Sequence, residues 1–125
     1  MRPRRAEDAP VGQLEHHRVD VADETIAVLD VPPDARRVRR FEVACAITVQ
    51  ALDGAESAWH QLTVLDNGAR QWERREPTRN LGDFDGLDVR FSREVAVGQS
   101  LRVTAAVRCL GSRCRRIVIE ADEQA

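Results

Sequence analysis

The stretch from residue 80 to residue 88, NLGDFDGLD, carries three aspartates around two glycines. Carboxylates spaced around a glycine turn can direct several oxygens toward one hard cation, as in calcium-binding loops. Asp83, Asp85 and Asp88 would supply carboxylate oxygens, and Asn80 an amide oxygen. The same residues also suit a tight turn in which carboxylates accept backbone N–H bonds. The spacing therefore leaves two interpretations, a Ca²⁺ loop or a capped turn.

The run GDFDG at residues 82–86 resembles the opening of the calcium loops of integrin-type β-propeller repeats. In that family the loop continues with a further Asp-Gly and recurs several times, whereas here it occurs once. The resemblance implies Ca²⁺ as a candidate ligand. Apart from this candidate, we expect no cofactor.

Two tryptophans, Trp59 and Trp72, flank the turn signal Asp66-Asn67-Gly68 in a chain with five aromatic residues. Since this turn predicts a hairpin, the two rings are expected near one another. Exposed, they would form a stacking platform for a sugar or an anchor for a protein partner. Buried, they would fill the core. The absence of tyrosine argues against a sugar-binding surface.

Four arginines lie within residues 36–40, namely Arg36, Arg37, Arg39 and Arg40. Guanidinium groups bind phosphates in a bidentate manner, so the cluster is a candidate patch for an anionic partner. Residues 1–40, however, balance eight arginines with eight acidic residues, and the whole chain has a net charge of −2. A dedicated nucleic-acid binder normally carries a basic surplus, so we do not expect nucleic acid as a partner.

The cysteine pair Cys109 and Cys114 invites a disulfide, but strand alternation argues against it. Cys109 shares its parity with the apolar residues of its strand, whereas Cys114 has the parity of polar residues in the next strand. Residues paired across a hairpin must share a face, so a bridge would need a bulge. A zinc site would need further ligands from Cys45, His16, His17 or His60, and no second close pair exists.

The remaining histidines and hydroxyl residues show no spacing that brings a nucleophile, a base and an orienting acid together. The sequence therefore predicts a protein that is not an enzyme.

The elements that must position these residues alternate with period two, which is the mark of half-buried strands. In residues 41–50, Phe41, Val43, Cys45, Ile47 and Val49 share one face. The other strand candidates are residues 19–21, 26–31, 59–65, 70–75, 87–92, 101–109 and 115–120.

Seven or eight short strands separated by Gly, Pro, Asn and Asp turns predict an all-β, antiparallel β-sandwich. A closed barrel would use the same pattern. The order of elements over residues 26–121 resembles small jelly-roll and galactose-binding-like sandwiches, with an Ig-like arrangement as a variant. This resemblance implies architecture and not activity.

The domain organisation follows from the same pattern. We expect a flexible tail over residues 1–13, one sandwich domain over 14–121 and an acidic tail over 122–125. No apolar run approaches the roughly 20 residues of a membrane span. The first residues are charged where a signal peptide would be apolar, so the expected location is cytoplasmic.

Two functions are compatible with these observations. The first is a non-catalytic interaction module that binds a partner protein, or itself, through a sheet face or edge. Outward Val118 and Ala106 are expected to make one exposed face less polar. The second is a carbohydrate-type binding sandwich that uses the Trp hairpin, assisted by Ca²⁺ at the acidic loop.

Overall fold

The computed structural model describes residues 13–79 and 84–125, which form eight strands and no helix. All eight predicted strands are present, most of them longer than the sequence pattern indicated. The strands are β1 (His16–Ala22), β2 (Ile26–Val31), β3 (Arg39–Ala51), β4 (Trp59–Asp66), β5 (Ala69–Pro77), β6 (Phe84–Val95), β7 (Leu101–Leu110) and β8 (Ser112–Glu123).

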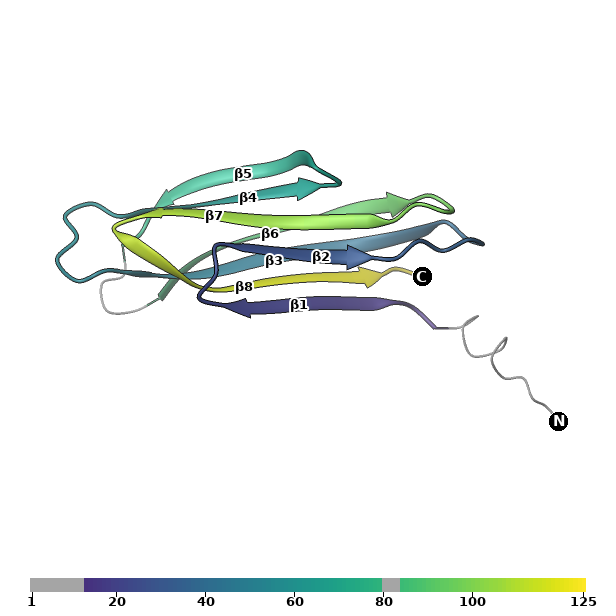
Figure 1. The fold of residues 1–125 in the computed structure, drawn as a ribbon, viewed down its shortest axis with the longest axis horizontal. Coiled ribbons are helices and arrows are strands. Elements are labelled where there is room, and N and C mark those ends of the chain that lie inside the picture. Colours follow the sequence, from purple (N-terminus) through teal and green to yellow (C-terminus); the bar gives the residue numbers. More distant parts are fainter. Residues whose placement is uncertain (1–12, 80–83) are drawn as a thin grey trace.

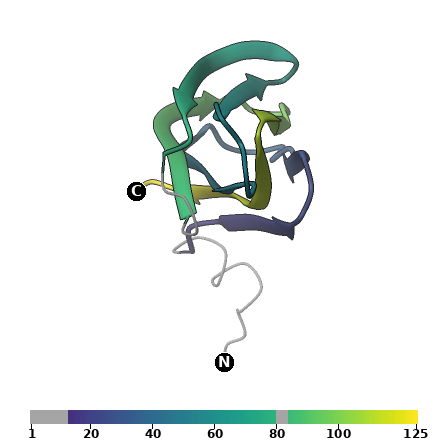
Figure 2. The ribbon, with the colours of Figure 1, turned by 90° about the vertical axis from the view of Figure 1, so that its left-hand side faces the viewer.

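The strands form two four-stranded antiparallel sheets that pack face to face (Figure 1). Sheet A has the order β1-β8-β3-β6 and sheet B has the order β2-β7-β4-β5. This strand order is that of a jelly roll, in which the chain passes back and forth between the two sheets and β4 and β5 follow each other within one sheet. Figure 2 looks down the long axis, along which the strands run. The predicted β-sandwich is therefore confirmed, and its jelly-roll form is the one observed.

The core lies between the sheets, where strand alternation places the apolar side chains. The five residues predicted to share a face of β3 are all buried, with Phe41, Val43, Cys45 and Val49 fully so. On β7, Leu101, Val103, Ala105 and Val107 fill the opposite side of the same core. Each fully buried aliphatic or aromatic side chain contributes about 1.5–3 kcal/mol, so this two-sided core is the main source of stability.

The β4–β5 hairpin closes as its Asn-Gly pair predicts. Asn67 and Gly68 both adopt positive φ, 48° and 86°, which is the backbone that a tight two-residue hairpin turn requires. Between Val64 and Leu65 the pairing of β4 with β5 shifts by one residue, because β5 contains an extra residue there, Gln71.

A bulge in β8 overturns the predicted orientation of Cys114. Thr48 pairs with Arg116 and Val49 with Cys114, so Arg115 is the extra residue. The insertion reverses the alternation, and both Cys114 and Ile117 point into the core. Cys114 therefore lies on the inner side, like Cys109, and not on the opposite face. All three cysteines are free thiols.

The last residues also differ from the expected domain boundaries. The predicted acidic tail at 122–125 is wrong for its first two residues, because β8 continues through Glu123 and the side chain of Glu123 is buried. The predicted tail at 1–13 lies outside the described residues except for Gln13.

Candidate functional site

The two described aspartates of the acidic loop point to opposite faces of β6. Asp85 pairs with Val49 and is half-buried, and it accepts a hydrogen bond of 2.7 Å from the backbone N–H of Arg79. Asp88 pairs with Ala46 and is exposed on the outer face. Two residues three positions apart in a strand cannot converge on one cation. Asp83 and Asn80 lie outside the described residues.

The predicted proximity of the two tryptophans is wrong. Trp59 pairs with Pro77 on the outer face of sheet B, whereas Trp72 pairs with Val64 and packs against the core. Val64 lies five positions after Trp59 in β4, so the two tryptophans are paired at points roughly 16 Å apart along the strand. The rings therefore form no joint platform for a sugar.

The four arginines of residues 36–40 do not assemble an anion-binding patch either. Arg39 points inward, and its side chain is only 1% exposed. Arg36 and Arg40 are exposed but project from a turn and from the outer face of β3. Arg37 is surrounded by carboxylates, so its charge is already matched. Alternation along β3 separates Arg39 from Arg40, and the sequence pattern missed this because it began the strand only at Phe41.

A carboxylate–arginine cluster takes the place of that patch. Arg37 bonds Glu15 at 3.0 Å and also bonds Glu123 and Asp34. Arg39 bonds Glu15 at 2.7 Å and the carbonyl of Pro32 at 2.8 Å. The Arg37 guanidinium holds the pKa of Glu123 below its usual value. This cluster joins the start of β1 to the end of β8, and it is structural.

The outer face of sheet B is apolar at its centre. Two rows of side chains cross it: Ile26, Ala106 and Thr63 in one, and Val28, Thr104 and Leu65 in the next. Ile26 is 52% exposed and Val28 is 41% exposed. We call these six residues the sheet B patch. Large exposed aliphatic side chains that lie together on one face are typical of a contact surface.

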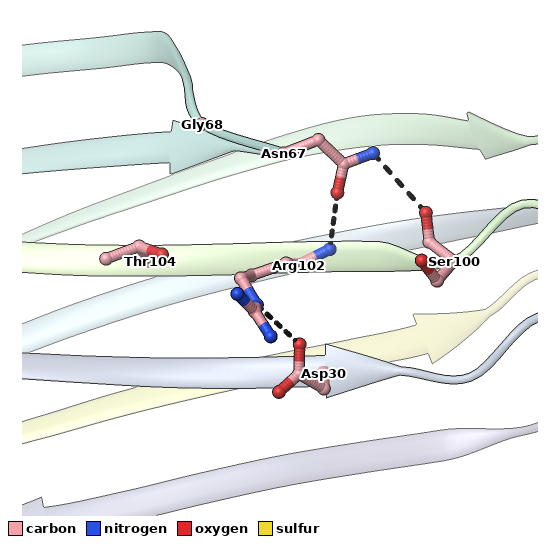
Figure 3. A pocket seen from close by; sticks show the side chains of 6 residues that line it. All are labelled: Asp30, Asn67, Gly68, Ser100, Arg102 and Thr104. Carbon is pink, nitrogen blue, oxygen red and sulfur yellow. Dashed lines mark hydrogen bonds and ion pairs between the residues drawn. The ribbon is translucent and has the colours of Figure 1, made fainter.

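Two hollows border the sheet B patch, one on each side. On one side Asn67, Arg102 and Asp30 line an open hollow of about 510 Å³, together with Gly68, Ser100 and Thr104 (Figure 3). Asn67 Oδ1 accepts from the backbone N–H of Arg102 at 2.7 Å, and Arg102 Nε donates to Asp30 at 2.8 Å. The first bond fixes the β4–β5 turn against β7, and the second joins β7 to β2.

On the other side of the sheet B patch, the guanidinium of Arg75 covers the ring of Trp59. The Arg75 guanidinium carbon lies 3.7 Å from the centre of the Trp59 ring, a cation–π contact. Arg75 Nε also donates to the side chain of Gln61 at 3.1 Å. A hollow of about 390 Å³ lies beside the pair, lined by Ala58, Glu76 and Pro77 as well. Sequence reasoning identified Trp59 but not its partner, because Arg75 lies sixteen residues away across a bulged hairpin.

The outer face of sheet A carries ion pairs between its edge strand β1 and β8, such as Arg116 with Asp20 at 2.5 Å and Arg18 with Glu120 at 3.5 Å. At the centre of this face Val118 on β8 pairs with Ala46 on β3. Val118 lies on this face and Ala106 on the other, so the expectation that both make one face less polar is wrong. In the described part of the chain, the exposed aliphatic side chains of Ile26 and Val28 thus lie together on sheet B, whereas ion pairs cover the β1 side of sheet A.

A buried histidine lies between the sheets. His60 Nδ1 shares a hydrogen bond of 2.7 Å with Thr78 Oγ1, and its Nε2 is buried with no hydrogen-bond partner in the described part of the chain. Burial lowers the pKa of His60, against the opposing effect of Asp85 and Glu76. Cys109 pairs with His60 across β7 and β4. Burial raises the pKa of the thiols, to about 12 at Cys45 and about 11 at Cys114, so these cysteines are unreactive.

Comparison with known proteins supports the fold alone. No family model and no curated protein matches the chain. Among solved structures, one similar chain is dimeric latent PorU from Porphyromonas gingivalis, with a TM-score of 0.55 and 11% sequence identity. The match covers 89% of this chain and 13% of PorU. Among the described residues there is no helix that could cross a membrane.

Proposed function

We propose that this chain is a non-catalytic protein-interaction module, and that its contact surface is the sheet B patch together with the edge of β2. The observation that carries this proposal is the adjacent pair of exposed large aliphatic side chains, Ile26 and Val28, on the outer face of the edge strand β2. Interfaces typically combine an apolar centre with a polar rim. Here the sheet B patch is the centre, and Arg102, Asp30, Arg75 and Gln61 form the rim. We place this module in the cytoplasm as part of the same proposal.

The β2 edge adds a second binding element. Natural sheets protect their edges with charges, prolines, bulges or short strands. The edge strand β5 has a bulge, Pro77 and several charged residues, and β1 and β6 carry alternating charges on their outer faces. By contrast β2, with the sequence IAVLDV, is short but has one charge, no bulge and no proline.

The free edge of β2 and the sheet B patch share residues. Val107 donates its N–H to the Thr25 carbonyl at 2.8 Å, so in antiparallel alternation Ala27 and Leu29 bond β7. The backbone groups of Ile26 and Val28 then face away from β7. The same residues present their side chains on the outer face, so an added strand would gain main-chain hydrogen bonds and apolar contacts together.

The occupant that best fits this edge is a second copy of the chain. If two β2 strands pair antiparallel about Ala27, Ile26 of one copy lies opposite Val28 of the other, and these aliphatic pairs repeat by symmetry. Asp30 then lies opposite Glu24 of the second copy. Arg102, which already binds Asp30, is placed to neutralise both carboxylates. Such a dimer would join two B sheets into one continuous sheet.

Sedimentation velocity over a wide range of protein concentration tests this proposal. We expect a concentration-dependent dimer in the wild type and a monomer in Val28→Lys, because a charge at the edge blocks pairing. Val97→Lys is the matched control. Val97 is similarly exposed, at 47%, but lies outside β2 and sheet B, so this variant should dimerise normally. A wild type that stays monomeric at high concentration, or a Val28→Lys variant that still dimerises, would overturn self-association through β2.

The alternative of a carbohydrate-binding module receives less support from the geometry. Its two tryptophans lie on opposite faces of sheet B, and the ring on the outer face is covered by Arg75. The described carboxylates of the acidic loop also diverge. We therefore make the interaction module the conclusion.

A further inference from the structure

A group of three potential metal ligands lies on the outer face of sheet A, at the end of the sandwich where β1 begins. His16 on β1 pairs directly with Asp122 on β8, and Glu120 lies two residues earlier on the same face of β8. One ligand atom from each of the three lies within 4.8 Å of the others. His16 Nδ1 already contacts Asp122 Oδ1 directly. Pairing between β1 and β8 thus brings together residues that are more than one hundred positions apart in the sequence.

The spacing suits a metal ion after small side-chain adjustments. Zn²⁺ binds nitrogen and oxygen ligands at about 2.0–2.2 Å, which puts neighbouring ligand atoms in a tetrahedral site roughly 3.4 Å apart. His16 and Asp122 have side chains that are 56% and 50% exposed, so both can rotate toward a shared ion. Their backbones are held by the β1–β8 ladder, so the three Cβ positions are already set before any ion binds.

Local charge also favours a cation at this place. Glu42 on β3 lies directly opposite Asp122 on the same face, and like charges directly opposite each other destabilise a sheet. Glu42 has a hydroxyl partner, Ser92 Oγ at 3.3 Å, and Glu120 has one guanidinium partner, Arg18 at 3.5 Å. Arg18 also contacts Asp20 at 3.5 Å, so its charge is divided between two carboxylates. A bound divalent ion would relieve this repulsion.

We propose that His16, Glu120 and Asp122 form a binding site for a divalent transition-metal ion of the zinc class. The imidazole of His16 determines this class of metal ion. Imidazole with carboxylates suits zinc and neighbouring transition metals, whereas Ca²⁺ takes oxygen ligands. The site is unrelated to the acidic loop at residues 80–88. It also lies on the opposite sheet from the proposed contact surface, so either proposal can fail alone.

Isothermal titration of the tag-free full chain with ZnCl2 tests the site, since an affinity tag of histidines would itself bind the ion. We expect saturable binding of about one Zn²⁺ per chain, weakened about tenfold or more by His16→Ala or Asp122→Asn, because each removes a direct ligand. The matched control is His17→Ala. His17 is the neighbouring residue but contacts Glu15 and the Phe41 ring on the other side of β1.

Cobalt substitution identifies the ligands independently of affinity. Co²⁺ bound by His16 and carboxylates should give weak visible absorption bands without the strong near-ultraviolet band of a thiolate ligand. Circular dichroism checks that each variant is folded, and Asp88→Asn provides a second control from the same face if His17→Ala is unstable.

Three outcomes would overturn the site: no saturable Zn²⁺ binding, binding that His16→Ala leaves unchanged, or a thiolate band that places the ion at the cysteines. Val28→Lys should bind Zn²⁺ like the wild type. Loss of the dimer with retained Zn²⁺ binding therefore bears on the proposed function alone.

Discussion

His60 shows how burial changes the chemistry of a single residue. In the sequence it is one of three histidines and a candidate base or metal ligand. In the structure it is 1% exposed and bonded to Thr78 through one nitrogen, and its other nitrogen has no hydrogen-bond partner among the described residues. A buried neutral imidazole of this kind fills a structural position. Burial raises the free energy of the charged imidazole, and this cost makes the free energy of unfolding depend on pH.

We predict that the protein loses stability as the pH falls below the ordinary histidine pKa of 6.5, because burial lowers the pKa of His60 in the folded state. Between the folded and unfolded pKa values the unfolded chain binds more protons, so the free energy of unfolding rises with pH. Melting temperatures at pH 7.5 and at about pH 5.5 measure the effect. His60→Gln should reduce the difference between the two values. An equal fall in the wild type and the variant would assign the pH dependence to other groups.

Alternation of apolar and polar residues defines the strands. Contacts between strands define where the strands end and where they bulge. The turn between β7 and β8 carries the chain from sheet B to sheet A through Gly111, which has a φ of 65°. A Cβ at this position would lie 2.5 Å from the Ser57 carbonyl oxygen. Only glycine allows the β7–β8 turn to pack this closely on the loop before β4.

Gly111→Ala is expected to destabilise the fold by about 3 kcal/mol, from backbone strain at positive φ plus a clash with a backbone carbonyl. Gly98→Ala is the matched comparison. Gly98 also has a positive φ, 78°, but nothing lies within 4 Å of its added Cβ. It should therefore cost only the strain, about 1 kcal/mol. Urea unfolding of both variants measures the difference, and equal losses would show that the clash at Gly111 relaxes.

At the scale of the whole molecule, the carboxylate–arginine cluster connects the two ends of the described chain. Arg39 bonds Glu15 before β1, the Pro32 carbonyl after β2 and, at 3.4 Å, the Gln99 carbonyl before β7. It also lies over the Phe41 ring at 5.4 Å. One buried side chain thus joins both sheets at the end of the sandwich where β1 begins and β8 ends (Figure 1).

Removing either partner of this buried pair should have unequal effects. Glu15→Ala leaves the Arg39 guanidinium buried without its carboxylate, which costs about 3 kcal/mol. Arg39→Met replaces the charge with an apolar side chain of similar length and should cost less, because no buried charge is left unpaired. Arg40→Met, on the exposed face of the same strand, should change stability by no more than about 0.5 kcal/mol. Denaturant unfolding ranks the three, and a larger loss for Arg39→Met than for Glu15→Ala would contradict this account.

The sequence by itself determined the strands, the inward face of β3 and β7, and the hairpin at Asn67-Gly68. These features depend on local alternation and on the backbone preferences of single residues, which neighbouring positions in the chain reveal. They were sufficient to predict the β-sandwich, although not the continuation of β8 through Glu123.

Only the tertiary structure decided which of the candidate residues meet. The bulge at Arg115 turned Cys114 inward, and the bulge at Gln71 turned Trp72 to the opposite face from Trp59. Cross-strand pairing extended β3 over Arg39 and β6 over Asp85, and alternation then separated Arg39 from Arg40 and Asp85 from Asp88. Conversely, pairing of β1 with β8 brought His16 to Asp122 and Glu120, and pairing of β2 with β7 placed Ile26 and Val28 beside Ala106 and Thr104. The physical reason is that a strand's face follows from counting along the chain. Its neighbours follow from which distant strands share a sheet, and a single inserted residue changes both.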